Sequence, residues 1–328
     1  MTLLLAGDIG GTHTRLGLFD PAGDWTPAVE RVYPSREHQS LDEIVQAFVA
    51  EVGRRPSHAC VAVAGPVRDE RAVVTNLPWV VDGAALTRLL GATAWVINDL
   101  EANAWGVATL QPADVAELHA GVPGVRGNAA VVAAGTGLGT AGLFWDGHQH
   151  RPFAAEGGHA TFAPSDERER ALAAWLAKRV GGHVSWERVV SGPGLVNVYE
   201  FLRDQGVAPE PAWLAEAMRT EDPGAAVSTA ALEGRAELAV QALDLFVGLY
   251  GAVAGNIALT VMAGAGVWLG GGIAPRILKK LADGTFVRRF VAKGRMQPLL
   301  EAMPVRVILN DGAALRGAAR CAAVRAAG

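Results

Sequence analysis

Two glycine-rich turns are the parts of this chain best suited to chemistry, because each directly follows an apolar stretch. Residues 7–12 read Gly-Asp-Ile-Gly-Gly-Thr, and residues 135–139 read Gly-Thr-Gly-Leu-Gly. Such turns let backbone N–H groups approach phosphate oxygens without a side chain in the way. Between them, Asn98 and Asp99 follow another apolar stretch and supply a carboxylate where an acceptor hydroxyl could sit. The combination points to phosphoryl transfer from a nucleotide to a small polar molecule.

The hydrophobic pattern predicts strands and helices in alternation around these residues, which is typical of an α/β fold. Ligands of such folds collect at the carboxyl ends of strands, where Asn98 and Asp99 are expected. Asp146-Gly147 predicts a two-residue hairpin. Buried strands are expected at residues 59–64, 94–97, 129–134, 141–145 and 266–269, and helices at residues 41–52, 100–110, 166–180, 193–204 and 243–262 and in a short segment after Asp82.

Composition limits the function classes. The chain has 328 residues, half of them hydrophobic, so it can form two domains with full cores. Its formal net charge is −4 at pH 7, which argues against nucleic acid as a partner. Residues 245–274 carry no charge, a length that would suit a membrane span, but eight glycines and Asn256 favour a buried helix and strand instead. No membrane partner is therefore expected.

The cysteines and the N-terminus predict a reducing, cytoplasmic location. Cys60 and Cys321 form no metal-binding or disulfide motif, and Cys60 is expected to be a buried thiol within an apolar stretch. Asp8 interrupts the first apolar stretch and no basic leader precedes it, so no signal peptide is expected.

Two further patterns permit other interpretations. Residues 137–142 fit the dinucleotide pattern Gly-x-Gly-x-x-Gly, but a strand is expected next where a dehydrogenase needs a helix. His148 and His150 are expected on one face of a strand, with His159 further on, and could hold a metal. Structural zinc needs four ligands and no cysteine lies nearby, which argues against that interpretation.

Taken together, the motifs resemble the bacterial glucokinase family of the actin-like ATPase superfamily. The matching segments occur in the family's order along nearly the whole chain: residues 7–12, 97–99, 135–139, 156–159, 185–197 and 270–276. The ROK sugar kinases are also similar, but they usually carry a cysteine-rich zinc motif after the histidine, and residues 160–164 contain no cysteine. The resemblance implies an α/β, two-domain actin-like ATPase (ribonuclease H-like) fold with an interdomain cleft. The small domain would comprise residues 1–109 and 311–328, and the large domain residues 110–310.

The resemblance also implies a role for each motif. Asp99 would be the general base that accepts the proton of the sugar 6-hydroxyl, although it could instead cap the helix that follows. Asp8 would act on Mg²⁺, through water. Sugar hydroxyls would be bound by Asn98, Asp99, Glu156, His159 and Glu187, with Thr75 and Asn76 nearby. ATP would be bound by Gly7, Asp8, Ile9, Gly10, Gly11, Thr12, Gly135, Thr136, Gly137, Gly271 and Gly272.

The expected activity is a cytoplasmic, ATP- and Mg²⁺-dependent glucokinase that forms glucose 6-phosphate and ADP. The resemblance favours a homodimer. Two alternatives stay open: a kinase for another hexose or an amino sugar, and a sugar sensor that has lost turnover.

Overall fold

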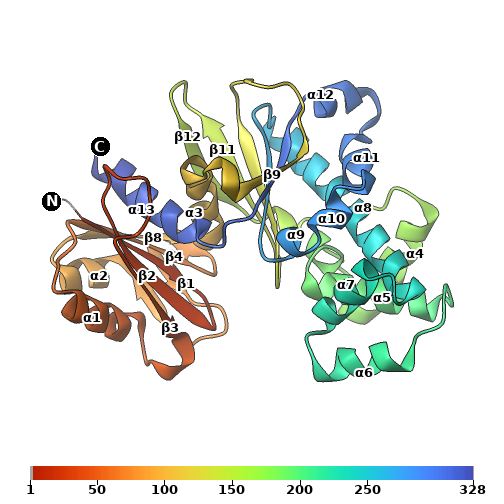
Figure 1. The fold of residues 1–328 in the computed structure, drawn as a ribbon, viewed down its shortest axis with the longest axis horizontal. Coiled ribbons are helices and arrows are strands. Elements are labelled where there is room, and N and C mark those ends of the chain that lie inside the picture. The colour runs from red at the N-terminus through yellow and green to blue at the C-terminus, as the bar shows by residue number, and fades with distance from the viewer. Residues whose placement is uncertain (1–2, 328) are drawn as a thin grey trace. The chain divides into compact units, whose positions relative to one another are not determined.

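A computed structural model describes residues 3–327, and the chain forms two compact units (Figure 1). The first unit comprises Met1–Asp114, Gln149–Ala154 and Asn310–Gly328, and the second comprises Val115–His148 and Ala155–Leu309. The C-terminal segment therefore returns to the unit that the N-terminal segment begins.

The first unit contains a five-stranded sheet in the order β3-β2-β1-β4-β8. Its strands are β1 (Leu4–Ile9), β2 (His13–Phe19), β3 (Val29–Pro34), β4 (His58–Val63) and β8 (Thr93–Asn98). Strands β1, β4 and β8 are parallel, with Ile9 opposite Val63 and Val63 opposite Asn98. This register places the end of β1, where the first glycine turn begins, at the same edge of the sheet as Asn98.

Helices cover both faces of this sheet. Helices α1 (Leu41–Val52) and α2 (Gly83–Leu90) share a core with one face, whereas α3 (Asp99–Gly106) and α13 (Ala313–Ala326) share a core with the other. Figure 1 shows α13, at the blue end of the chain, beside the red first strands. A small second sheet is formed by β5 (Val67–Arg68), β6 (Arg71–Val73) and β7 (Val80–Asp82).

The second unit is built around a sheet in the order β12-β11-β10-β13-β14-β9. Its strands are β9 (Val115–His119), β10 (Ala129–Ala134), β11 (Leu138–Trp145), β12 (His150–Ala155), β13 (Gly266–Gly270) and β14 (Val305–Ile308). Strands β10, β13 and β14 are parallel, so the second glycine turn and the Gly270–Gly272 turn follow strands that end at the same edge. Both sheets thus collect glycine turns at the carboxyl ends of parallel strands.

Helix α8 (Glu237–Val261) forms the centre of the second unit's core. The other helices are α4 (Glu167–Val180), α5 (Gly192–Asp204), α6 (Ala212–Thr220), α7 (Pro223–Leu232), α9 (Ile273–Arg276), α10 (Leu278–Leu281), α11 (Thr285–Val291) and α12 (Gln297–Glu301). Helix α8 is long and apolar enough to be considered for a membrane span, but 72% of its apolar window is buried inside the structure. The predicted buried helix is thus confirmed, although it begins at Glu237 because Leu238 and Ala239 extend its buried face.

The predicted hairpin at Asp146-Gly147 is wrong in its length. Strand β11 ends at Trp145 and β12 begins at His150, so four residues connect them. The Asp146 carboxylate accepts the His148 amide at 2.9 Å, which closes a longer turn than the two-residue type. His148 consequently lies in this loop, and only His150 belongs to the strand that was expected to carry both histidines. Among residues 3–327, no group of three or more His, Cys, Asp or Glu side chains is placed to hold a metal ion.

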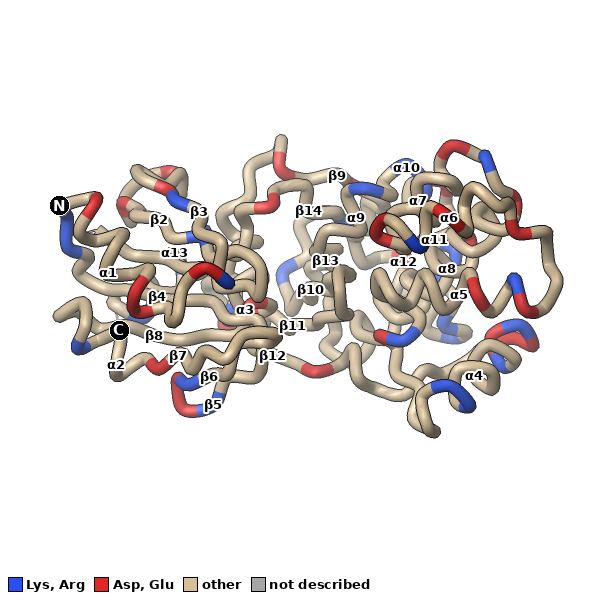
Figure 2. Tube along the Cα trace, turned by 90° about the horizontal axis from the view of Figure 1, so that it is seen from below, with Lys and Arg blue, Asp and Glu red and all other residues tan. Residues whose placement is uncertain are grey.

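Acidic and basic residues are interspersed along the Cα trace of each unit, as Figure 2 shows. This interspersed pattern agrees with the small net charge of −4.

Candidate active site

The first glycine turn, residues 10–12, connects β1 to β2 and closes on itself. The Gly10 amide donates to His13 O at 2.9 Å. A Cβ atom at Gly11 would lie only 3.0 Å from Thr75 O, so the loop can approach the Thr75 backbone only because this position lacks a side chain. Of the other predicted ATP residues here, Gly7 and Ile9 lie within β1, where Ile9 packs into the core.

Asp8 lies opposite Arg15 in the pairing of β1 with β2. Burial raises the pKa of the Asp8 carboxyl, the Arg15 charge partly offsets this rise, and the Asp311 charge adds to it. Arg15 Nη2 donates to Asp311 Oδ2 at 2.8 Å. Neither Arg15 nor Asp311 was predicted as a site residue; the signal for Asp311 was its place at the start of residues 311–328, the segment expected to rejoin the small domain.

Asn98 ends β8 and positions the start of α3. Its Oδ1 accepts the Leu100 amide at 2.9 Å, which makes Asn98 the N-cap of the helix, and its Nδ2 donates to Gly65 O at 2.9 Å. Asp99 is the first residue of α3, and its Oδ1 also accepts the Leu100 amide, at 3.0 Å. The capping role considered for Asp99 therefore belongs chiefly to Asn98.

A row of contacts joins Asn98 to the first glycine turn. Gly65, which Asn98 contacts, adopts a φ of 145°, and a Cβ there would lie 3.3 Å from Thr75 Oγ1. The Thr75 amide donates to Ala64 O at 2.9 Å, and Gly11 packs against Thr75 O. The first unit thus brings together four segments that are separate in sequence: residues 10–12, 64–65, 75–76 and 98–99.

In the second unit, Glu187 contacts the second glycine turn. Glu187 Oε2 accepts the Leu138 amide at 3.1 Å, and a Cβ at Gly137 would lie 2.6 Å from the same oxygen. The Gly192 amide also fixes the turn, because it donates to Gly135 O at 2.8 Å. The side chain predicted to bind sugar is therefore in direct contact with the turn predicted to bind ATP.

Glu156 directly precedes a short 3₁₀ turn, η4 (Gly157–His159), and His159 is its last residue. Their side chains are 70% and 61% exposed, and His159 Nε2 lies 3.8 Å from Glu156 Oε2. The turn packs closely on β11, because a Cβ at Gly158 would lie 1.9 Å from Leu138 O. The carbonyl of Leu138 therefore contacts η4, and its amide donates to Glu187. The three predicted sugar residues of this unit, Glu156, His159 and Glu187, thus lie around Leu138.

The Gly271-Gly272 turn lies beside the second glycine turn. Gly271 has a φ of +78°, and a Cβ there would lie 2.3 Å from Ala134 O, so the position requires glycine. Gly272 is exposed, and no atom lies within 4 Å of its Cβ position. The predicted phosphate and adenosine segments of this unit are therefore adjacent, since Ala134 directly precedes Gly135.

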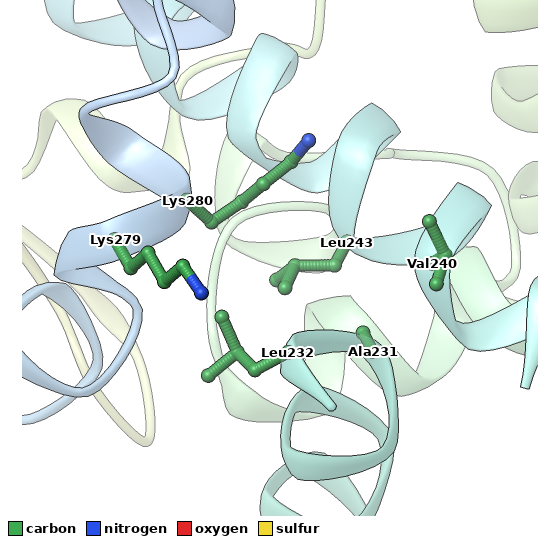
Figure 3. A pocket seen from close by; sticks show the side chains of 6 residues that line it. All are labelled: Ala231, Leu232, Val240, Leu243, Lys279 and Lys280. Carbon is green, nitrogen blue, oxygen red and sulfur yellow. The ribbon is translucent and has the colours of Figure 1, made fainter. Parts of the chain in front are cut away.

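A separate cavity of about 150 Å³ in the second unit does not include any of the predicted site residues. It is lined by Ala231, Leu232, Val240, Leu243, Lys279 and Lys280. Figure 3 shows the Lys279 amine beside Leu232, whereas the Lys280 side chain extends away from the cavity. Lys280 forms ion pairs with Asp244 and Asp283, which accounts for its direction.

Comparison with known proteins identifies the family. The Glucokinase family profile matches residues 5–325. A glucokinase from Nostoc punctiforme is 43% identical over 340 residues, which cover 98% of this chain and 99% of that protein. The chain belongs to the glucokinase family. A second family member, a glucokinase from Saccharophagus degradans, is 35% identical, with 96% of each chain covered.

Solved structures share the fold of this glucokinase-family chain. A glucokinase from an Antarctic psychrotroph matches with a TM-score of 0.85 and 30% identity over 99% of both chains. A ROK-family glucokinase from Streptomyces griseus, solved with glucose and AMPPNP, matches with a TM-score of 0.65 and 22% identity, covering 98% of this chain and 99% of that one. The expected family and the expected two-domain actin-like ATPase fold are both confirmed.

Proposed function

We propose that this protein transfers the γ-phosphate of ATP to the 6-hydroxyl of glucose, giving glucose 6-phosphate and ADP. The observation that carries the proposal is the 43% identity to a glucokinase along 98% of the chain. The two clusters of predicted site residues support it, because each unit assembles its own set from segments far apart in sequence. We further propose that the enzyme is cytoplasmic and homodimeric. Its small functional domain would comprise residues 1–109 and 311–328, and its large one residues 110–310.

In the first unit, Asp99 is proposed as the general base. As the 6-hydroxyl oxygen bonds to the γ-phosphorus, its proton passes to the Asp99 carboxylate and the bond from the γ-phosphorus to the ADP oxygen breaks. Asn98 fixes the start of α3 and hence the place of Asp99, because its side chain binds both Leu100 N and Gly65 O. Thr75 and Asn76 are proposed to lie near the sugar, and residues 10–12 to receive the β- and γ-phosphates, with the Gly11 and Thr12 amides as donors because the Gly10 amide is bound to His13 O.

In the second unit, Glu156, His159 and Glu187 are proposed to bind the remaining sugar hydroxyls. A sugar hydroxyl both donates and accepts hydrogen bonds, so carboxylate and imidazole side chains are suitable partners for it. The exposed side chains of Glu156 and His159 are available to a ligand without breaking a core contact. Gly135, Thr136 and Gly137 would hold the nucleotide phosphates, and Gly271 and Gly272 would admit the adenosine.

Asp8 is proposed to hold Mg²⁺ through water. One carboxylate at the base of a phosphate-binding turn fits this ion, which keeps several waters and takes its other ligands from phosphate. The bound ion would neutralise charge on the transferred phosphate. Asp311 adds a second carboxylate near Asp8, while Arg15 balances their negative charge.

The decisive test is a glucose phosphorylation assay with MgATP, coupled to glucose-6-phosphate dehydrogenase, on the wild type and Asp99→Asn. We expect wild-type turnover and a loss of roughly 10²–10⁴-fold in kcat for the variant, with both proteins equally folded by thermal unfolding. A wild type without turnover on glucose contradicts the proposal. A panel of mannose, fructose and N-acetylglucosamine then separates another sugar kinase from a sensor that binds sugar without turnover.

A further inference from the structure

Ser35 lies directly beneath the first glycine turn, although it is 25 residues away from Gly10 in sequence. It begins η1 (Ser35–Glu37), the short turn that follows β3, and its side chain is completely buried. The Ser35 amide donates to Thr12 O at 2.9 Å, and its Oγ donates to Gly10 O at 2.8 Å. One residue therefore contacts both ends of the three-residue turn.

The buried hydroxyl of Thr14 completes this network. Thr14 Oγ1 lies 3.0 Å from Ser35 Oγ. A serine hydroxyl has one proton, and Ser35 gives it to Gly10 O, so Thr14 must be the donor to Ser35. The chain of donation runs from Thr14 through Ser35 to Gly10 O, and it satisfies every polar atom involved.

Other contacts also fix the turn. The Cβ position of Gly11 lies 3.0 Å from Thr75 O, and Gly10 N donates to His13 O. Several segments thus support the turn before any phosphate arrives. A preorganised turn binds phosphate more tightly, because less conformational entropy is lost on binding.

We propose that Ser35 is a positioning residue for the nucleotide phosphates. Its side chain and amide bind the carbonyls of Gly10 and Thr12, and with Gly10 N held by His13 O this leaves the Gly11 and Thr12 amides for phosphate oxygens. The inference rests on the proposed function in one respect, that residues 10–12 receive the phosphates of ATP.

The test compares MgATP and glucose binding to the wild type and to Ser35→Ala, by calorimetry and steady-state kinetics. Loss of the hydroxyl leaves Gly10 O and Thr14 Oγ1 without their partner and loosens the turn. We expect the dissociation constant and KM for MgATP to rise about 5- to 10-fold, as for one lost hydrogen bond. The glucose dissociation constant measured without nucleotide should change by less than about twofold, because the sugar residues keep their own contacts.

Thr109→Ala is the matched control. Thr109 has another buried hydroxyl of the first unit, which donates to Gly106 O at 2.7 Å and not to a residue of the glycine turn. Both variants should lower the melting temperature, but only Ser35→Ala should weaken MgATP binding. Equal effects on MgATP binding in the two variants, or none in Ser35→Ala, would overturn the proposal.

A milder variant covers the case in which Ser35→Ala does not fold. Thr14→Val keeps the shape of the side chain and the bond from Ser35 to Gly10 O, and removes only the donor to Ser35. We expect a rise in the MgATP dissociation constant of about two- to threefold, and an unchanged value contradicts the inference.

Direct binding separates this inference from the proposed function. A wild type that binds MgATP but does not phosphorylate glucose refutes the proposed function, and the Ser35 variants then decide the inference by binding alone. A wild type that does not bind MgATP refutes both.

Discussion

Glu187 contacts the glycine turn of the second unit while it stands beside the other proposed sugar residues. Its Oε2 accepts the Leu138 amide, and the absence of a side chain at Gly137 makes room for the same oxygen. Glu156 differs, because its side chain is 70% exposed and its Oε2 lies 3.8 Å from His159 Nε2. Both carboxylates are proposed to bind sugar, but Glu187 also contacts the turn proposed to bind the nucleotide, whereas Glu156 is exposed.

Removing each carboxylate should therefore give different kinetic signatures. Glu187→Ala should raise KM for both glucose and MgATP, each by about tenfold or more, because a hydrogen bond to a charged group is lost at the turn. Glu156→Ala should raise KM for glucose alone. Steady-state kinetics with each substrate varied in turn measures the difference, and an unchanged KM for MgATP in Glu187→Ala would show that the contact with Leu138 does not affect nucleotide binding.

Among the helices, α8 and α11 pack together through glycines of α8. A Cβ at Gly251 would lie 2.2 Å from Phe286 O, and one at Gly255 would lie 2.4 Å from Phe290 O. At Gly248, on the same helix, the closest atom to a Cβ would be Arg289 Cγ at 3.5 Å. The apolar length that suits a membrane span is therefore used for helix contact inside the core, as the buried aromatic residues of α11 also indicate.

Alanine at these glycines tests that contact. Gly251→Ala should lower the free energy of unfolding by about 1–3 kcal/mol, because α11 must move to relieve the overlap. Gly248→Ala should leave stability unchanged or raise it by up to about 1 kcal/mol, because alanine favours the helix and the flexible arginine can yield. Denaturant unfolding of both variants measures the difference, and equal stabilities would refute the close packing of α11 on Gly251.

For the whole molecule, the return of the chain to its first unit decides which residues can meet. Helix α13 packs against β1, β4 and α3, and a Cβ at Gly317 would lie 1.8 Å from Ala102 O. Its start also brings Asp311 to Arg15. The C-terminal helix therefore supports both α3, which carries Asp99, and the strand that carries Asp8.

Truncation tests this dependence. A chain that ends at Leu309 should lose activity and the cooperative unfolding of the first unit, because the buried face of α13 is removed from its core. A chain that ends at Val324 loses Arg325 with its ion pairs to Glu70 and Glu101, which should cost about 1 kcal/mol or less. Circular dichroism and the coupled assay report both effects. Full activity in the shorter chain would contradict the role of α13.

The sequence by itself determined the local elements and the order of the motifs. Strand β10 at residues 129–134 and helix α1 at residues 41–52 lie where the hydrophobic pattern placed them, since periodicity records which face of a segment is buried. The same pattern missed the short strands β9 and β14, whose few residues carry no clear period. It also ended the helix after Asp99 too late, because Val107–Thr109 tightens into a 3₁₀ turn.

Only the tertiary structure decided which distant residues touch. Cys60 is buried as predicted, but it also shares a core with Cys321 of α13, and burial together with the nearby Cys321 thiol raises the Cys60 pKa. Ser35 beneath Gly10 and Asp311 beside Arg15 are pairings of the same kind. Hydrophobic periodicity acts along one segment, whereas such contacts depend on how segments are packed across the chain. That packing is fixed by the summed burial of both cores, and no single motif records it.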